Sequence, residues 1–362
     1  MKISLAMIVK DEEKHIARCL ESAIPLVDEI VIVDTGSTDN TIRIIKGFKD
    51  VKLYHFKWCD NFSIARNFSI EKATGDYLLV LDADEYITHS DRSELEDIMT
   101  KNQVGRIKVC SHFLNKDQVR HSQSYITRFF PKDTQYRGAI HEQIQTQRKK
   151  VNLELSVNHE GYFQTNKGER NIPLLLKELK KKPNDVYYLF QLGKELRINK
   201  QYDKAFYFLY NAYGLIDLND NYYGELVIEL INSGKEIGNK EVITIIEKNK
   251  LYLDNLADFH FSVGLFYLDY CLKVPSEANL ETMQKIENSF LHCLKIHKDP
   301  NCMEYLQGSS SYLAAYNLGV YYEVVGDIKK AFHYYNLSLK FGYSIAELRL
   351  SILEKEYNIL GL

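Results

Sequence analysis

Three acidic residues follow a strongly apolar segment within four positions of the chain. Residues 77–81 are YLLVL, and Asp82, Asp84 and Glu85 come directly after them. A run of this length and composition predicts a strand buried on both faces. Because an unpaired buried carboxylate is costly, we expect a cationic partner at the end of this strand. Asp82-Ala83-Asp84 carries the alternate carboxylates that suit a hard divalent cation with open positions for phosphate oxygens. A solvated turn or a helix N-cap is the alternative for so short a pattern on its own.

A second group of polar residues lies in the turn-rich segment VDTGSTDNT, residues 33–41. Asp34 follows another apolar segment, Gly36 permits a tight turn, and Ser37 can help to start the next helix. A carboxylate such as Asp34 can accept hydrogen bonds from a base or a ribose. An ordinary β-to-α turn would explain the same residues, and the sequence leaves both interpretations open.

One arginine, two histidines and a glutamate complete the set. Arg66, in NFSIARNFSIEKATGDY, has a side chain well shaped for phosphate recognition, and a surface ion pair is the alternative. His141 and Glu142 lie in YRGAIHEQI, and His159 lies in NHEGY. A histidine could complete the coordination of a metal held by Asp84, and Glu142 could act as a general base. A lone histidine is more often structural, and no HExxH or zinc-finger spacing is present.

The elements that must position these residues alternate between strand-like and helix-like segments. The apolar segments 3–9, 29–34, 51–56 and 77–81 predict strands, with helices around 12–22, 39–46 and 62–73. This alternation favours βαβ units and a mostly parallel, Rossmann-like α/β sheet. Ligands then bind beyond the carboxyl ends of the strands, where Asp34 and Asp82 both fall. Residues 105–113 and 124–130 predict a hairpin-like addition carrying acceptor-side residues, and 153–162 predicts the last strand.

From about residue 171 the composition changes. Twenty of the 26 tyrosines lie beyond that point, and the strand-like alternation disappears. Residues 189–215 and 315–339 both show the spacing of a tetratricopeptide repeat. In the first, Gly193 and Ala205 would let paired helices approach closely, and in the second Gly319 and Ala331 take the same places. Residues 222–251 and 257–296 predict two degenerate helix pairs, and 344–358 a capping helix. Generic helix-pair packing is the alternative to a repeat solenoid.

Composition narrows the class of protein. The net charge of −3 and the lack of a basic arm give no indication of a nucleic-acid partner. Six scattered cysteines, among them Cys302, resemble neither a disulfide framework nor a zinc site. With no signal sequence and no apolar stretch long enough to span a membrane, we expect a soluble cytoplasmic protein. No GxGxxG follows a strand, which weakens the case for a dehydrogenase. The sequence has no Walker A motif, which excludes a P-loop enzyme, and no GxSxG elbow that would suggest a hydrolase.

Four segments together carry a resemblance to a known family. SLAMIVKDEEKHIARCLES, EIVIVDTGSTDNT, NFSIARNFSIEKATGDYLLVLDADE and YRGAIHE resemble, in this order, the motifs of family 2 glycosyltransferases of the GT-A type. The resemblance runs from the N-terminus to about residue 165. With its tetratricopeptide-like tail, the chain is similar to bacterial protein glycosyltransferases, including those that modify flagellin and the sublancin-type peptide S-glycosyltransferases. It implies a GT-A catalytic domain over 1–170 and a tetratricopeptide-like domain over 171–362.

The resemblance also implies which residues bind a UDP-sugar donor. Asp34 would hold the uracil or ribose with Ser37 near it, Arg66 would help to place the donor, and Asp82 would meet ribose or sugar. The remaining donor-binding positions would be Met7, Val9, Glu12 and Ala83.

A divalent cation and a base follow from the same resemblance. Asp84 would ligate Mn²⁺ or Mg²⁺ bridging the diphosphate, with His159 as the candidate for the third metal ligand and His141 as its competitor. The ED motif that supplies the catalytic base in many relatives is not cleanly present. Glu142 is the candidate base in its place, and the preceding residue, His141, is the other catalytic candidate. The family implies inversion at the anomeric carbon.

Three functions remain open at this point. The first is transfer of a sugar, from UDP-GlcNAc or UDP-glucose, to a protein or peptide, on a Ser/Thr hydroxyl or on cysteine as a variant. The second is extension of a cell-surface or lipid-linked glycan, with the repeats as scaffold. The third is an inactive tetratricopeptide adaptor, which would not need Asp34, Asp82 and Asp84. The repeats would bind an acceptor through a concave surface or form a homo-oligomer.

Overall fold

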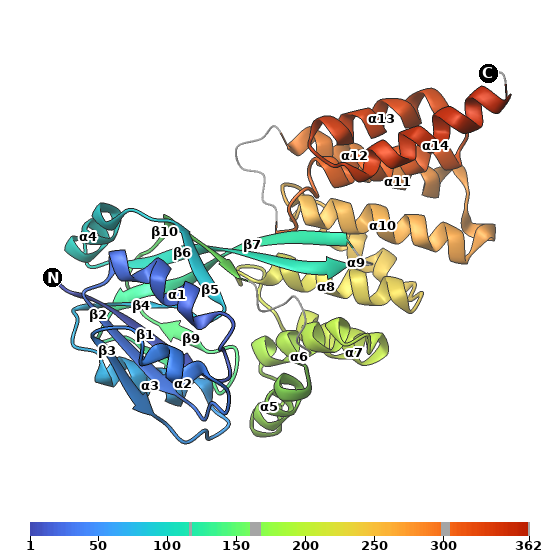
Figure 1. Ribbon diagram of the computed structural model, residues 1–362. Coiled ribbons are helices and arrows are strands. Elements are labelled where there is room, and N and C mark those ends of the chain that lie inside the picture. Colours follow the sequence, from blue (N-terminus) through green and yellow to red (C-terminus); the bar gives the residue numbers. More distant parts are fainter. Residues whose placement is uncertain (116–117, 160–167, 298–304, 361–362) are drawn as a thin grey trace. The chain divides into compact units, whose positions relative to one another are not determined.

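The computed structural model describes residues 1–115, 118–159, 168–297 and 305–360, and Figure 1 shows its helices and strands. The chain divides into two compact units, Met1–Glu178 and Leu179–Leu362. The expected boundary after residue 170 falls inside helix α5, Gly168–Lys181, and stays a prediction. Cys302 and the end of the expected strand 153–162 lie outside the described residues. The other five cysteines are free thiols.

The first half of the N-terminal unit is a parallel βαβ arrangement, as the sequence predicts. Strands β1 (Ile3–Val9), β2 (Glu29–Asp34), β3 (Val51–His55) and β4 (Tyr77–Val80) lie in the order β3-β2-β1-β4 and are all parallel. Helices α1 (Ile16–Ala23), α2 (Thr41–Ile45) and α3 (Phe62–Lys72) connect them (Figure 1). Alternate residues of β1 enter different cores, Met7 one and Ala6 the other. Both faces of the central strands are therefore covered, which explains their continuous apolar runs.

The second half of the sheet is largely antiparallel. The long hairpin β6 (Val104–Asn115) and β7 (Gln118–Pro131) joins the sheet through β7, which is antiparallel to β4. Strand β10 (Lys150–His159) is parallel to β6, and the edge strand β5 (Glu85–His89) is antiparallel to β10. The predicted hairpin and the α/β class are confirmed, and four of the seven pairings within the eight-stranded sheet are parallel. Strand β5, helix α4 (Arg92–Thr100) and the small sheet of β8 (Gln135–Arg137) and β9 (Gln143–Gln145) were not predicted.

The described residues of the C-terminal unit form helices and no strands, and consecutive helices form pairs that match the predicted repeats (Figure 1). The pairs are α6 (Val186–Ile198) with α7 (Tyr202–Tyr213), α8 (Tyr223–Glu236) with α9 (Glu241–Asn249), α10 (Ala257–Lys273) with α11 (Leu280–Ile296), and α12 (Tyr312–Val324) with α13 (Ile328–Lys340). Helix α14 (Ile345–Leu360) follows as the expected last helix. Among the described residues, no helix combines the length and the apolar character needed to cross a bilayer.

Glycines at two equivalent positions explain how the helices of a pair approach. A Cβ added to Gly193 of α6 would lie 2.5 Å from Leu209 Cγ of α7. A Cβ added to Gly319 of α12 would lie 2.6 Å from the Tyr335 ring of α13. Both neighbours are fully buried, so neither can move aside freely, and the close helix packing requires glycine.

We expect Gly193→Ala to destabilise the helical unit by about 1–3 kcal/mol, the usual cost of an extra methyl group in a packed core. Gly214→Ala is the matched control, because its Cβ would lie no nearer than 3.6 Å to another atom and its φ of −71° is ordinary for alanine. Urea unfolding followed by circular dichroism measures both. Equal free energies of unfolding for the two variants would show that α6 and α7 are not packed this closely.

Candidate active site

The carboxyl ends of β1, β2 and β4 lie at the same edge of the sheet, since the three strands are parallel neighbours. Asp34, the last residue of β2, is buried, and its carboxylate accepts hydrogen bonds from the amides of Gly36 and Ser37, both at 3.1 Å. Gly36 has a φ of +113°, which favours glycine. These bonds order the β-to-α turn, and His55 Nδ1 lies 3.4 Å from Oδ2 of the same carboxylate.

The loops after β1 and β2 are tied to each other. The Asp11 amide donates to Ser37 Oγ at 3.0 Å, and the Thr38 amide donates to Asp11 Oδ1 at 2.7 Å. The amide of Glu12, whose side chain is half-buried, donates to Thr41 Oγ1 at 2.7 Å. The structure thus brings Glu12, Ser37 and Asp34 to one rim of the sheet edge.

Three predicted donor-binding residues have buried side chains. Met7, Val9 and Ala83 belong to the sheet core and are at most 4% exposed. The Val9 carbonyl already accepts the amide and the hydroxyl of Thr35, at 2.9 and 3.0 Å. Any contact of these three residues with a nucleotide would therefore be made by the main chain, and their roles stay predictions.

Two arginines meet the carboxylates that follow β4. Arg66 of α3 contacts Asp82 Oδ1 at 2.7 Å through Nη2 and Glu142 Oε1 through Nε. Arg128 of β7 contacts Asp82 Oδ2 at 2.6 Å and Glu85 Oε1 at 3.3 Å. Both arginines and Glu85 are buried, whereas the Asp82 side chain is 32% exposed. We call these five residues the arginine–carboxylate cluster.

Charge in this cluster sets the protonation of its carboxylates. Burial acts to raise the pKa of Asp82, but Arg128 and Arg66 outweigh it and hold that pKa well below its usual value. The pKa of Glu85 is raised, because burial and the neighbouring charge of Asp82 outweigh Arg128. Asp82, the most accessible acid here, is therefore held as a carboxylate at the rim of the site.

The arginine–carboxylate cluster supplies part of the cationic partner that was expected at the end of β4. For Asp82 and Glu85 that partner is Arg66 together with Arg128, and sequence reasoning missed Arg128. Its signal was a single charge between apolar neighbours in the strand sequence YITRFF. Arg66 directs two of its nitrogens to carboxylates and is 7% exposed. It would act on a donor through Asp82, and this role stays a proposal.

Asp84 has a different partner. His159 Nε2 lies 3.1 Å from Asp84 Oδ2, and the other ring nitrogen, Nδ1, lies 3.3 Å from Ser111 Oγ of β6. The register of β10 with β5 places His159 opposite Glu85, which brings the pair together. The two side chains are only 12% and 8% exposed. A carboxylate oxygen and an imidazole nitrogen, with the ring held from behind, form a donor set that fits a divalent cation such as Mn²⁺.

His141 is the alternative metal ligand that was predicted from the sequence. It has a positive φ of +50° in the turn between β8 and β9 and directly precedes Glu142. Glu142 is bound by Arg66. The histidine that the structure pairs with Asp84 is His159, which favours the first of the two expected ligands.

A sheet that is parallel in its first half, with acidic residues at the carboxyl ends of two strands, defines a Rossmann-like domain. Residues 4–153 match the family model described as glycosyl transferase family 2, so the N-terminal unit carries a domain of this family. The expected combination of such a domain with tetratricopeptide-like helices is thereby confirmed.

Known proteins resemble parts of this chain. A TPR repeat-containing protein of Synechococcus elongatus is 31% identical over 210 residues, covering 53% of this chain and 51% of that protein. The SPbeta prophage-derived glycosyltransferase SunS of Bacillus subtilis is 29% identical over 219 residues, covering 57% and 52%. The crystal structure of S. aureus TarS aligns with a TM-score of 0.33 at 14% identity, over 83% of this chain and 53% of TarS. The chain spans about half the length of these two curated relatives.

Proposed function

We propose that this chain transfers a sugar from a UDP-sugar, either UDP-GlcNAc or UDP-glucose, to a protein or peptide. The acceptor atom would be a Ser or Thr hydroxyl, with flagellin as one possible substrate class and cysteine as a variant acceptor. The observation that carries the proposal is the Asp84–His159 pair, 3.1 Å apart beside Asp82, at the carboxyl edge of a family 2 domain. The expected cytoplasmic location belongs to this proposal and rests on the cysteine pattern.

The donor would lie along the sheet edge. Asp34 and Ser37 would hold the uracil or ribose, and Asp82 would meet the ribose or sugar as a fixed carboxylate. Asp84 and His159 would hold Mn²⁺ or Mg²⁺ against the diphosphate. A cation bound there supplies positive charge where negative charge builds on the departing phosphate oxygen.

The chain's own residues must then align the two reacting groups. In an inverting transfer the acceptor attacks the anomeric carbon from the face opposite the diphosphate, so both groups must be held in line. Glu142 is the proposed base, and Arg66 fixes its carboxylate by an ion pair through Oε1. The acceptor oxygen would lose its proton to this carboxylate as the new bond to the sugar forms.

We expect Glu142→Gln to lower transfer by roughly 100-fold, at the lower end of what a general base contributes. The amide keeps an oxygen that can accept from Arg66, so affinity for UDP should stay within twofold or so of the parent protein. Initial rates and UDP titration separate the two effects. Unchanged turnover would place the base elsewhere, and equal loss of UDP affinity would make Glu142 a positioning residue.

The helical unit is the proposed acceptor-binding part. Among its tyrosines, Tyr188, Tyr322 and Tyr335 are buried between helices, whereas Tyr207 and Tyr210 of α7 are 62% and 41% exposed. The buried rings stabilise the helix pairs. The exposed rings of α7 offer the amphipathic contact area that suits a peptide. Association of two copies through the same unit is the further proposal for this part of the chain.

Release of UDP and the fate of the sugar test the proposal. The full chain is incubated with UDP-GlcNAc or UDP-glucose, with Mn²⁺, Mg²⁺ or EDTA. The acceptors offered are a pool of peptides containing Ser, Thr and Cys and a lipid-linked glycan. Metal-dependent UDP release with one hexose or N-acetylhexosamine mass added to peptide is the expected result. UDP release with sugar added only to a glycan would favour the glycan-extending enzyme. No release with either donor and either metal would favour the adaptor.

A further inference from the structure

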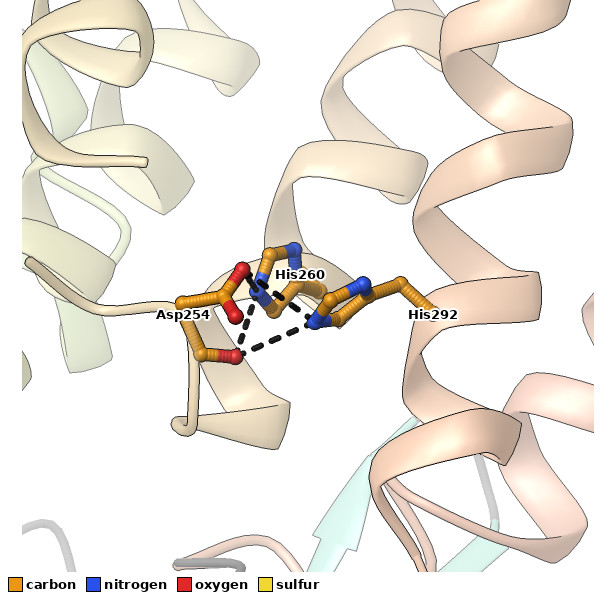
Figure 2. Close-up of side chains that lie close together, drawn as sticks. All are labelled: Asp254, His260 and His292. Carbon is orange, nitrogen blue, oxygen red and sulfur yellow. Dashed lines mark hydrogen bonds and ion pairs between the residues drawn. The ribbon is translucent and has the colours of Figure 1, made fainter. Parts of the chain in front are cut away.

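A compact group of metal-ligating side chains lies in the helical unit, outside the candidate active site. Asp254 is in the segment between α9 and α10, His260 is in the first turn of α10, and His292 is on α11. Figure 2 shows the two imidazole rings turned toward Asp254, and their centroids are 4.0 Å apart. The three ligand atoms lie within 4.8 Å of one another, and no other such group of three or more occurs among the described residues.

The separations within this group suit a common cation. His260 Nε2 and His292 Nε2 lie 2.9 and 3.2 Å from the Asp254 main-chain oxygen. They lie 3.8 and 3.3 Å from Asp254 Oδ1. Ligands placed about 2.0–2.1 Å from a tetrahedral Zn²⁺ are roughly 3.3 Å apart. The two nitrogen–carboxylate separations are therefore close to those of such a site, and all three ligand atoms lie within 4.8 Å of one another, so side-chain movements could bring them to one ion.

Accessibility also fits an ion that enters from solvent. The His260 and His292 side chains are only 12% and 24% exposed, whereas the Asp254 side chain is 55% exposed. The group is thus closed on the imidazole side and open on the carboxylate side.

Hydrogen bonding alone is the competing explanation. A main-chain carbonyl can accept two hydrogen bonds, so both imidazoles could donate Nε2–H to the Asp254 oxygen. That arrangement does not involve the Asp254 carboxylate, although its Oδ1 lies 3.3 Å from His292 Nε2. In the metal-bound form both rings carry their proton on Nδ1, and Nε2 is free to ligate.

We propose that Asp254, His260 and His292 bind a late first-row divalent cation of the Zn²⁺ type. Two imidazole nitrogens and one carboxylate favour such an ion over Mg²⁺ or Ca²⁺, which prefer oxygen ligands. Water or the Asp254 main-chain oxygen would take a further position. The ion would fasten the start of α10 to α11, and its role would be structural and independent of sugar transfer.

Co²⁺ is the probe, because its visible absorption reports low-coordinate nitrogen and oxygen ligands. The full chain, stripped of metal with EDTA and dialysed, is titrated with Co²⁺ and then with Zn²⁺. We expect an intense visible band that saturates near one equivalent and is displaced by Zn²⁺. Zn²⁺ should also raise the melting temperature.

The variants His292→Gln and Asp254→Asn keep the shape and the hydrogen-bonding capacity of the side chains. We expect each to weaken Co²⁺ binding at least about tenfold and to abolish the Zn²⁺-dependent rise in melting temperature. Without metal, each should melt close to the parent protein. The control is His333→Gln on α13, because His333 is an exposed histidine of the same unit, and it should bind Co²⁺ as the parent does.

Three results would overturn the proposal. The first is no intense band in the parent protein, which would leave the histidines as hydrogen-bond donors to the Asp254 carbonyl. The second is a band that persists in His292→Gln and Asp254→Asn, which would place the ion at other residues. A strong near-ultraviolet charge-transfer band would likewise assign the ion to a cysteine thiolate instead.

Discussion

Asp84→Ala is expected to lower UDP release from the donor about 1000-fold while the protein remains folded. The expectation follows from a loss of roughly 4 kcal/mol of charge stabilisation, at about 1.4 kcal/mol for each factor of ten in rate. Asp84 is in the turn between β4 and β5, outside both strands, so its removal deletes a proposed ligand and little packing. Initial rates of UDP release at saturating Mn²⁺ measure the effect.

The control for Asp84→Ala is Asp97→Ala on α4. Asp97 is 54% exposed and pairs with Lys101 one turn away, an interaction that contributes about 0.3–0.5 kcal/mol at most. This variant should release UDP at the parent rate. Normal turnover in Asp84→Ala, or turnover that EDTA does not reduce in the parent, would remove the metal assignment from Asp84.

Arg128→Met is expected to lower the free energy of unfolding by about 3–5 kcal/mol, the cost of removing one member of a buried ion pair. Methionine fills much of the volume, so the loss comes from the carboxylates: Asp82 would keep Arg66, whereas Glu85 would lose the arginine that contacts it. Burial acts to lower the pKa of Arg128, but Asp82 and Glu85 outweigh it and raise that pKa well above its usual value, so this guanidinium stays charged.

Arg106→Met on the neighbouring strand β6 provides the comparison. Its Nη2 lies 3.4 Å from the Tyr125 carbonyl, and the side chain is only partly buried. Urea unfolding should show a change within about 0.5 kcal/mol for this variant. If Arg128→Met unfolds at the same urea concentration as Arg106→Met, the arginine–carboxylate cluster does not hold the carboxylates in the way described.

Much of the fold could be predicted because each well-predicted strand or helix pair shows one clear sequence pattern. The central parallel strands are buried on both faces, so they appear as continuous apolar runs, and β1 and β2 have the predicted limits. Strand β5 was missed because it begins at Glu85, inside the acidic segment, and its last two residues, Thr88 and His89, are exposed at the sheet edge. The helical repeats were found through small residues such as Gly193, whose contact with Leu209 leaves no space for a side chain.

The candidate site was predictable where a motif holds its residues close in sequence. Asp82 and Asp84 are two positions apart, and Asp34 ends a strand. Arg128 was missed because β7 brings it to Asp82 across 46 residues. His260 and His292 escaped notice for the same reason, since two helices and the turn between them separate them in sequence. Contacts between strands or helices that are distant in sequence depend on how these elements are aligned against each other, and the residue pattern of a single segment does not predict that alignment.

Calorimetric titration of the full chain with UDP, in Mn²⁺ and in EDTA, tests the central claim that Asp84 and His159 form a metal-dependent nucleotide-sugar site. The account predicts saturable binding of one UDP in Mn²⁺, loss of that binding in EDTA, and its loss in Asp84→Ala even with Mn²⁺ present. Equal affinity in Mn²⁺ and in EDTA, or no binding with either Mn²⁺ or Mg²⁺, would contradict it.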